Sequence, residues 1–269
     1  MCAAFVQPEW YFSHALTLIK DHTEFLVLTI QPLLSTEPLL SIYDAKEEFI
    51  SGMVSILSTK IAADLELLMQ PGNEALFCHT ISEAMLFDKL LRDIHSYSKR
   101  LPGCTEAFVI NAEALELWLE QETAATRARM HEVMNATDAW QAQFGRLFAE
   151  VDQFRPSRSA ENIIVLLIAV AERYSLVTSP TTKYMFFDRL QRMILHEYLR
   201  EIRVQFIGHK GKCAELSMLA NSANYIRALL TEWQDDPVRE RRSLSLARSF
   251  VRSFVRSFVR SFLVCFYLI

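Results

Sequence analysis

The stretch DAKEEFISGMVSILSTKIAADLELL, residues 44–68, decides the fold class. Its large apolar side chains recur every three or four positions, which is the spacing of one face of an α-helix. They are Phe49, Met53, Ile56, Leu57, Ile61, Leu65 and Leu68. Asp44 followed by Glu47 resembles a capping box, and Pro71-Gly72 marks an end. The stretch therefore predicts one long amphipathic helix.

The same pattern continues on both sides of this stretch. It predicts further helices over 9–30 and 74–99, a helix that Asn111 can cap, and helices over 129–153, 160–177, 181–207 and 212–234. Proline or glycine stands at several boundaries, as at Ser179-Pro180 and Gly208. The run IIVLLIAVA is also compatible with a buried strand, but its neighbours favour a helix with several packing partners. We predict an all-α fold, an extended bundle or rod of about eight helices with short loops.

Composition excludes several classes of protein. Only six of the 269 residues are glycine, which disfavours an all-β fold and a glycine-rich phosphate loop. The first residues lack the basic segment of a signal peptide, and no run of eighteen uncharged apolar residues predicts a membrane span. The cysteines stand at 2, 78, 104, 213 and 265 without a CxxC pair, so we interpret them as reduced thiols of a cytosolic protein.

Charge is distributed unevenly along the chain. Residues 239–269 contain seven arginines and one glutamate, a net charge of +6. The whole chain carries −4, so residues 1–238 carry about −10. A protein that binds nucleic acid neutralises phosphates with lysine and arginine, and so this acidic segment is a poor candidate for such binding.

The end of the chain contains RSFVRSFVRSFVRSFL, residues 248–263. On a helix each four-residue step advances ~400°, so arginine and phenylalanine both spiral around the axis. On a strand they share one face. Neither structure separates charge from apolar surface, as a membrane-surface helix would. A repeated tetranucleotide CGTT, read as CGT-TCG-TTC-GTT, would encode this unit, and we interpret 239–269 as a translated simple repeat. The alternative is a membrane-surface protein bound through its basic tail.

Three local patterns could indicate chemistry. Cys78-His79 with Glu83 suggests a nucleophile and base, but neighbouring residues on a helix do not face each other, and we interpret the pair as buried packing. GHKGK at 208–212 lacks the strand and spacing of a P-loop. Asp235, Asp236 and Glu240 could bind magnesium in a helical prenyl-diphosphate enzyme, but Pro237 interrupts them.

The other histidines and two tryptophans indicate no metal or catalytic site. The histidines at 14, 22, 95, 131 and 196 have no mutual metal-ligand spacing, and Trp118 and Trp140 are expected to pack between helices. We therefore predict no catalytic, cofactor-binding or metal-binding residue, and not an enzyme.

Six stretches, taken in order, resemble the RINT/TIP family of vesicle-tethering subunits. They are HALTLIKDHTEFLVLTIQPLL (14–34), DAKEEFISGMVSILSTKI (44–61), FCHTISEAMLFDKLLRDI (77–94), LELWLEQETAATRARMHEVMNATDAW (115–140), SAENIIVLLIAVAERYSLV (159–177) with YMFFDRLQRMILHEYLREI (184–202), and YIRALLTEWQDDP (225–237). Ser82 stands where the family usually has aspartate. The resemblance extends over about 10–238 and stops where the repeat-derived tail begins.

The resemblance implies a helical-rod tethering domain over 10–238 and a non-catalytic role. It further implies a subunit of a Dsl/NRZ-type complex at the cytoplasmic face of the endoplasmic reticulum (ER), held there through partners. Such a complex captures Golgi-derived vesicles in retrograde transport and engages ER SNARE proteins and sister subunits. The family's preceding coiled coil and following helices are not matched, so we expect a fragment of the middle.

Overall fold

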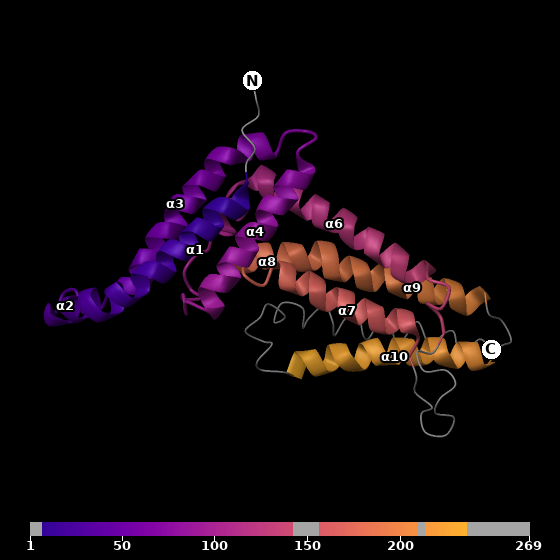
Figure 1. Ribbon diagram of the computed structural model, residues 1–269. Helices are drawn as coiled ribbons and strands as arrows, with labels where there is room; N and C mark the ends of the chain where they lie inside the picture. Colours follow the sequence, from indigo (N-terminus) through magenta and orange to yellow (C-terminus); the bar gives the residue numbers. More distant parts are fainter. Residues whose placement is uncertain (1–6, 142–155, 209–212, 236–269) are drawn as a thin grey trace. The chain divides into compact units, whose positions relative to one another are not determined.

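The computed structural model describes residues 7–141, 156–208 and 213–235 (Figure 1). Within these ranges every regular element is a helix, and the elements join into eight continuous helices. The predicted all-α class is confirmed. The chain divides into two compact units. The first holds the described residues up to Gln121 together with Leu176–Ser179, and the second holds those of Glu122–Ser175 and from Pro180 onward.

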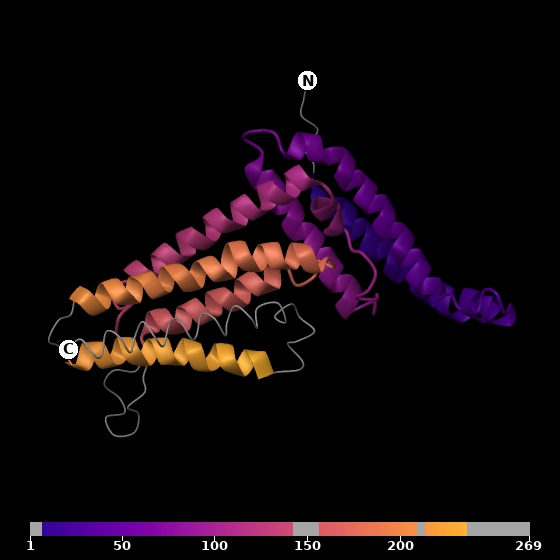
Figure 2. The ribbon, with the colours of Figure 1, turned by 180° about the vertical axis from the view of Figure 1, so that it is seen from behind.

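The first unit begins with a continuous helix formed by α1 (Pro8–Phe25), the π-helical turn η1 (Leu26–Ile30) and α2 (Gln31–Thr36). It continues with α3 (Ala45–Leu68), α4 (Glu74–Asp93), the short α5 (Glu106–Ile110) and the start of α6 (Ala112–Asn135). Helix α1 packs against both α3 and α4 (Figure 2). Helix α3 also contacts α5. Apolar side chains line these contacts: Phe12, Ala15, Ile19, Ile50, Val54, Leu57, Ile61, Phe77, Ile81, Ala84 and Phe87.

The predicted helix caps of this unit are present. The Asp44 carboxylate accepts a hydrogen bond from the Glu47 amide at 2.8 Å, which satisfies one of the unpaired amides at the start of α3. Asn111 accepts from the Ala114 amide at 3.0 Å in the same way at the start of α6. The Glu47 carboxylate itself accepts from the Ser98 amide at 3.2 Å, which joins α3 to the segment after α4.

Several predicted boundaries were wrong. The helix predicted over 9–30 continues through α2 to Thr36, and the helix predicted over 160–177 ends at Arg173. Helix α4 ends at Asp93 rather than near 99, because Ser96 takes the left-handed conformation with φ 59° and the chain turns so that Tyr97 packs inside. The helix predicted from Asn111 and the first residues of the helix predicted over 129–153 form a single helix, α6, which ends at Asn135 in a turn. Residues 142–153 of the second prediction lie outside the described residues.

The second unit contains the rest of α6, then α7 (Arg158–Arg173) and a continuous helix of α8 (Pro180–Phe186), η2 (Phe187–Gln191) and α9 (Arg192–Gly208). Helix α10 (Cys213–Asp235) follows. Both α7 and α9 contact α10. The core of the second unit contains Ile163, Leu167, Val170, Phe186, Leu190, Ile194, Ile202, Leu219, Ala223, Ile226 and Leu230. The predicted helix start at Pro180 and the predicted helix end at Gly208 are confirmed.

The apolar run 163–171 is helical, as favoured, but it is not buried on most sides. Ile163, Ile164, Leu167 and Val170 are buried, whereas Val165 is 63% exposed. The helix therefore buries one stripe toward its neighbours. An ion pair between Arg173 and Glu122, with 2.8 Å from Nε to Oε1, joins the end of α7 to α6 within this unit.

Candidate partner-binding surface

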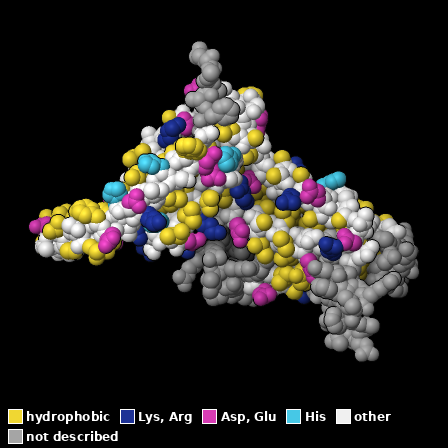
Figure 3. Space-filling model, viewed as in Figure 1, with side chains coloured by type: hydrophobic (Ala, Val, Ile, Leu, Met, Phe, Trp, Pro, Cys, Tyr) yellow, Lys and Arg dark blue, Asp and Glu magenta, His cyan; other side chains and the backbone are white. Residues whose placement is uncertain are grey.

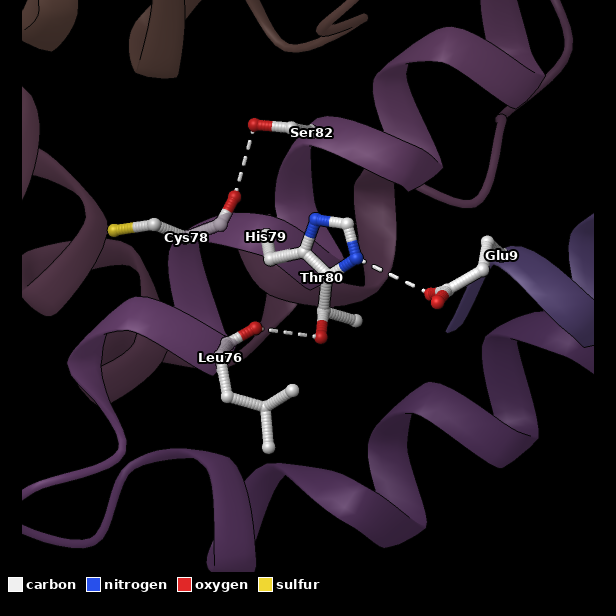
Figure 4. Close-up of polar contacts among 6 residues, drawn as sticks. All are labelled: Glu9, Leu76, Cys78, His79, Thr80 and Ser82. Atoms are coloured by element: carbon white, nitrogen blue, oxygen red, sulfur yellow. Dashed lines mark hydrogen bonds and ion pairs between the residues drawn. The ribbon is translucent and has the colours of Figure 1, made fainter. Parts of the chain in front are cut away.

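The structure does not bring the candidate nucleophile and base together. Cys78 and His79 lie next to each other on α4, and their side chains point in different directions (Figure 4). His79 is exposed rather than buried, and its Nε2 lies 3.1 Å from Oε2 of Glu9 on α1. Cys78 is half-buried, and its carbonyl accepts a hydrogen bond from Ser82 at 2.9 Å. Side chains that diverge in this way do not form an activated nucleophile–base pair.

The remaining sequence candidates form no site in the described chain. Asp235 is the last residue of α10, while Asp236, Glu240, residues 209–212 and the tail lie outside the described residues. Within the described ranges, no three histidine, cysteine or acidic side chains converge as metal ligands. Trp118 is buried, and Trp140 stacks on Tyr198 with 5.9 Å between ring centroids. Across 7–141, 156–208 and 213–235 no helix is long and apolar enough to cross a membrane.

The most buried charged side chain of the first unit, Asp88, was not identified from the sequence. Asp88 projects from α4 and is 1% exposed. Its carboxylate accepts hydrogen bonds from the amides of Cys104 and Thr105, at 2.7 and 2.9 Å, and from the Thr105 hydroxyl at 2.5 Å. Burial raises the pKa of this carboxyl, while the bonds from Thr105 and Cys104 lower it. Asp88 therefore fixes the loop before α5 and serves packing.

Cys104 in this loop is expected to resist alkylation. Its side chain is fully buried, and burial raises the pKa of its thiol well above the usual range. The thiolate is the reactive form, so the native protein should leave Cys104 unmodified by iodoacetamide at pH 8. Peptide mapping by mass spectrometry would measure this, with the urea-unfolded protein as the control. Equal modification of Cys104 in both states would contradict the buried placement.

The second unit contains a buried cluster of hydroxyl groups. Ser157 accepts from the Ser222 hydroxyl at 2.9 Å, and the Ser157 amide donates to that hydroxyl at 2.8 Å. Ser159 lies 2.9 Å from Ser157 and 3.0 Å from the Tyr198 hydroxyl. Burial raises the pKa of Tyr198 to about 12. With every hydroxyl paired, the cluster joins the start of α7 to α9 and α10, and its role is structural.

A different kind of surface covers the end of the first unit. From Lys20 to Asp44 no residue is buried, although many side chains there are large and apolar. We call residues 25–43 the apolar tip. Its exposed large hydrophobic side chains are Phe25, Val27, Leu28, Leu33, Leu39, Leu40, Ile42 and Tyr43. Figure 3 shows hydrophobic side chains gathered over α2 at this end. Contiguous apolar surface of this kind marks interaction sites.

The apolar tip is ordered by hydrogen bonds. The Gln31 side chain donates to the Tyr43 carbonyl at 3.1 Å and accepts from the Ala45 amide at 2.7 Å, so one side chain holds the turn against α2. Backbone bonds from Leu40 and Ser41 to the Glu37 carbonyl, both 3.0 Å, close the turn itself. The exposed apolar side chains are therefore presented on a preformed scaffold, which lowers the entropic cost of binding.

Replacing Gln31 with alanine should loosen this turn. Two hydrogen bonds are lost, each contributing about 0.5–1.5 kcal/mol, and the tip lacks a buried core that would compensate. We expect faster amide hydrogen exchange in 40–45 and unchanged exchange in 50–61 of α3. Replacing the exposed Ser35 with alanine is the matched control on the same helix. Unchanged exchange at the Tyr43 and Ala45 amides in Gln31→Ala would contradict the assigned role of Gln31.

Comparison with known proteins identifies a family and two relatives to which this chain is similar. The model of the RINT-1/TIP-1 family matches residues 4–238, most of the chain. The chain belongs to the RINT-1/TIP-1 family. A RINT1-like protein of Drosophila melanogaster is 25% identical over 230 residues, covering 86% of this chain and 30% of the relative. The RINT1-like protein MAG2 of Arabidopsis thaliana is 22% identical over 261 residues, covering 86% and 33%.

The RINT-1/TIP-1 match includes both units and ends before the repeat-containing tail. The chain spans about a third of the length of these curated relatives. No solved structure matches it. Within the family stretch 77–94, the buried side chains are Phe77, Thr80, Ile81, Ala84, Phe87, Asp88 and Leu91. That stretch is therefore mainly a packing face of α4.

Proposed function

We propose that this RINT-1/TIP-1 family member is a non-catalytic tethering subunit in vesicle transport from the Golgi to the ER. The family match over 4–238 is the observation that carries this proposal. The resemblance of the six quoted stretches supplies its content, because the family is one of vesicle-tethering subunits. We propose 10–238 as the functional segment, and 239–269 as sequence without a domain of its own.

The proposed subunit works by protein contacts with sister tether subunits and ER SNARE proteins. It uses no cofactor and binds no nucleic acid, and these partners hold it at the cytoplasmic face of the ER membrane. Two features support a contact mechanism. Long helices present extended surfaces on which a partner helix can lie. The side chains of Cys78 and His79, the described candidates for catalysis, point in different directions on α4, and His79 lies 3.1 Å from Glu9.

Proximity labelling in animal cells would test this proposal. The full chain, fused to a biotin ligase, should label ER SNARE proteins and tether subunits in preference to other cytosolic proteins. The ligase alone, at the same expression level, sets the background. Labelling indistinguishable from that background, at equal amounts of folded protein, would reject the tethering role.

A further inference from the structure

The apolar tip has a property that the tethering role alone does not predict: acidic residues flank it on both sides in the sequence. Residues 20–48 contain six acidic side chains and two lysines, a net charge of −4 with histidine neutral. Asp21, Glu24, Glu37 and Glu48 are exposed. None of the ion pairs in the described chain involves Glu24 or Glu37. Their negative charge is therefore available to a partner.

We infer that the apolar tip is the docking site for an amphipathic partner helix that carries lysine or arginine beside its apolar stripe. This inference rests on the proposed function, since it names a contact by which the tether would act. An amphipathic helix matches a surface that offers apolar contact and charge together. The basic side chains of the partner complete the charge pattern, which favours encounter and correct register.

The position of the apolar residues also fits a helix as occupant. Leu28 and Leu33 project from the continuous helix η1–α2, while Leu39 and Ile42 come from the turn that Gln31 holds against it. Leu39 and Ile42 are each 80% exposed, and Leu28 is 66% exposed. The helix and the turn therefore supply apolar contacts from two sides of one preformed end. Burial of such side chains by a partner provides the main part of the affinity.

Charge disfavours the other occupants of this surface. A second copy of the chain would bring one acidic tip against another, and like charges across an interface oppose association. An anionic lipid surface would be repelled for the same reason. A basic segment without a separate apolar stripe would satisfy the charge but leave the apolar side chains uncovered. The combination of apolar centre and acidic surroundings selects a basic, amphipathic helix.

Designed peptides provide the test, with the full chain as receptor. Binding of three fluorescent 18-residue peptides is measured by fluorescence anisotropy. The first is a helix with a leucine stripe flanked by lysine, and the second has glutamate in place of each lysine. The third has the same amino acids as the first in a scrambled order that forms no stripe. We expect the first to bind at least ten times more tightly than either of the others. Equal binding of the lysine and glutamate peptides, or of the ordered and scrambled peptides, would overturn the inference.

Variants locate the binding on the tip. The double variant Leu39→Ser with Ile42→Ser should lower the affinity for the lysine peptide at least about tenfold, because two apolar contacts are lost. Ile110→Ser is the matched control, since Ile110 is 81% exposed and lies on α5, outside the tip. Glu24→Gln with Glu37→Gln should remove the preference for lysine over glutamate. Unchanged affinity in the Leu39/Ile42 variant, with native circular dichroism, would place the site elsewhere.

Two further outcomes separate this inference from the proposed function. A dimer in analytical ultracentrifugation that the Leu39/Ile42 variant abolishes would assign the tip to a second copy and overturn the inference. Proximity labelling of ER SNARE proteins together with failed peptide binding would retain the tethering role and reject the tip as its contact. Peptide binding at the tip without such labelling would support the docking site and reject the tethering role.

Discussion

Replacing Asp88 with alanine is expected to lower the free energy of unfolding by about 3 kcal/mol or more. The substitution leaves the amides of Cys104 and Thr105 and the Thr105 hydroxyl without their acceptor. All three donors are buried, and each buried unpaired donor costs about 1–3 kcal/mol. Urea unfolding of the full chain, followed by circular dichroism, would measure the loss.

Asp93→Ala is the control, because Asp93 is exposed on the same helix and should change the unfolding free energy by less than ~0.5 kcal/mol. A double-mutant cycle with Gly103→Ala sharpens the test. A Cβ at Gly103 would lie far inside van der Waals contact with the Asp88 carboxylate. Gly103→Ala should therefore destabilise the wild type by about 1–3 kcal/mol and the Asp88→Ala variant by much less. Additive effects would contradict the contact between Gly103 and Asp88.

Replacing Tyr198 with alanine is expected to destabilise the second unit by about 3–5 kcal/mol. The side chain is 2% exposed, its ring stacks on Trp140, and its hydroxyl belongs to the buried cluster. Alanine removes the ring, creates a cavity and leaves Ser159 without one partner. Tyr198→Phe keeps the ring and removes only the hydroxyl, so its cost should be about 1–3 kcal/mol.

Tyr184 provides the comparison for Tyr198, because it lies on the same continuous helix and is about half exposed. Tyr184→Ala should cost less than ~1 kcal/mol. Hydrogen exchange of the α7 and α10 amides would report the loss within this unit. Similar effects of alanine at 184 and 198 would show that the buried cluster contributes nothing specific.

The helices were predictable where the signals were local. The 44–68 stretch has both its period and its cap within a few residues, and Asp44 and Asn111 cap the helices as expected. The end of α4 was not predictable in this way. It depends on the left-handed Ser96 and on the packing of Tyr97, whose hydroxyl donates to the Pro102 carbonyl at 3.1 Å. Such contacts appear only when the tertiary fold is known.

The candidate surface could not be predicted because apolar residues look alike in a sequence whether they face a core or a partner. Ile19 and Leu28 belong to the same predicted helix, 9–30, yet Ile19 is buried whereas Leu28 is 66% exposed. The Gln31 bonds to Tyr43 and Ala45 span 12 and 14 residues, and no local pattern indicates them. The acidic residues around the apolar tip can be read from the sequence. Whether they mark a binding surface depends on which neighbouring side chains are exposed, and only the structure shows this.

Affinity purification of the tagged full chain from animal cells, with partners identified by mass spectrometry, tests the central claim most directly. The Leu39/Ile42 and Ile110 variants would be purified in parallel. We expect recovery of tether subunits and ER SNARE proteins by the wild type and Ile110→Ser, with at least one of these partners lost from the Leu39/Ile42 variant. Recovery of chaperones alone by the wild type would contradict the claim that this RINT-1/TIP-1 family member acts by binding transport proteins.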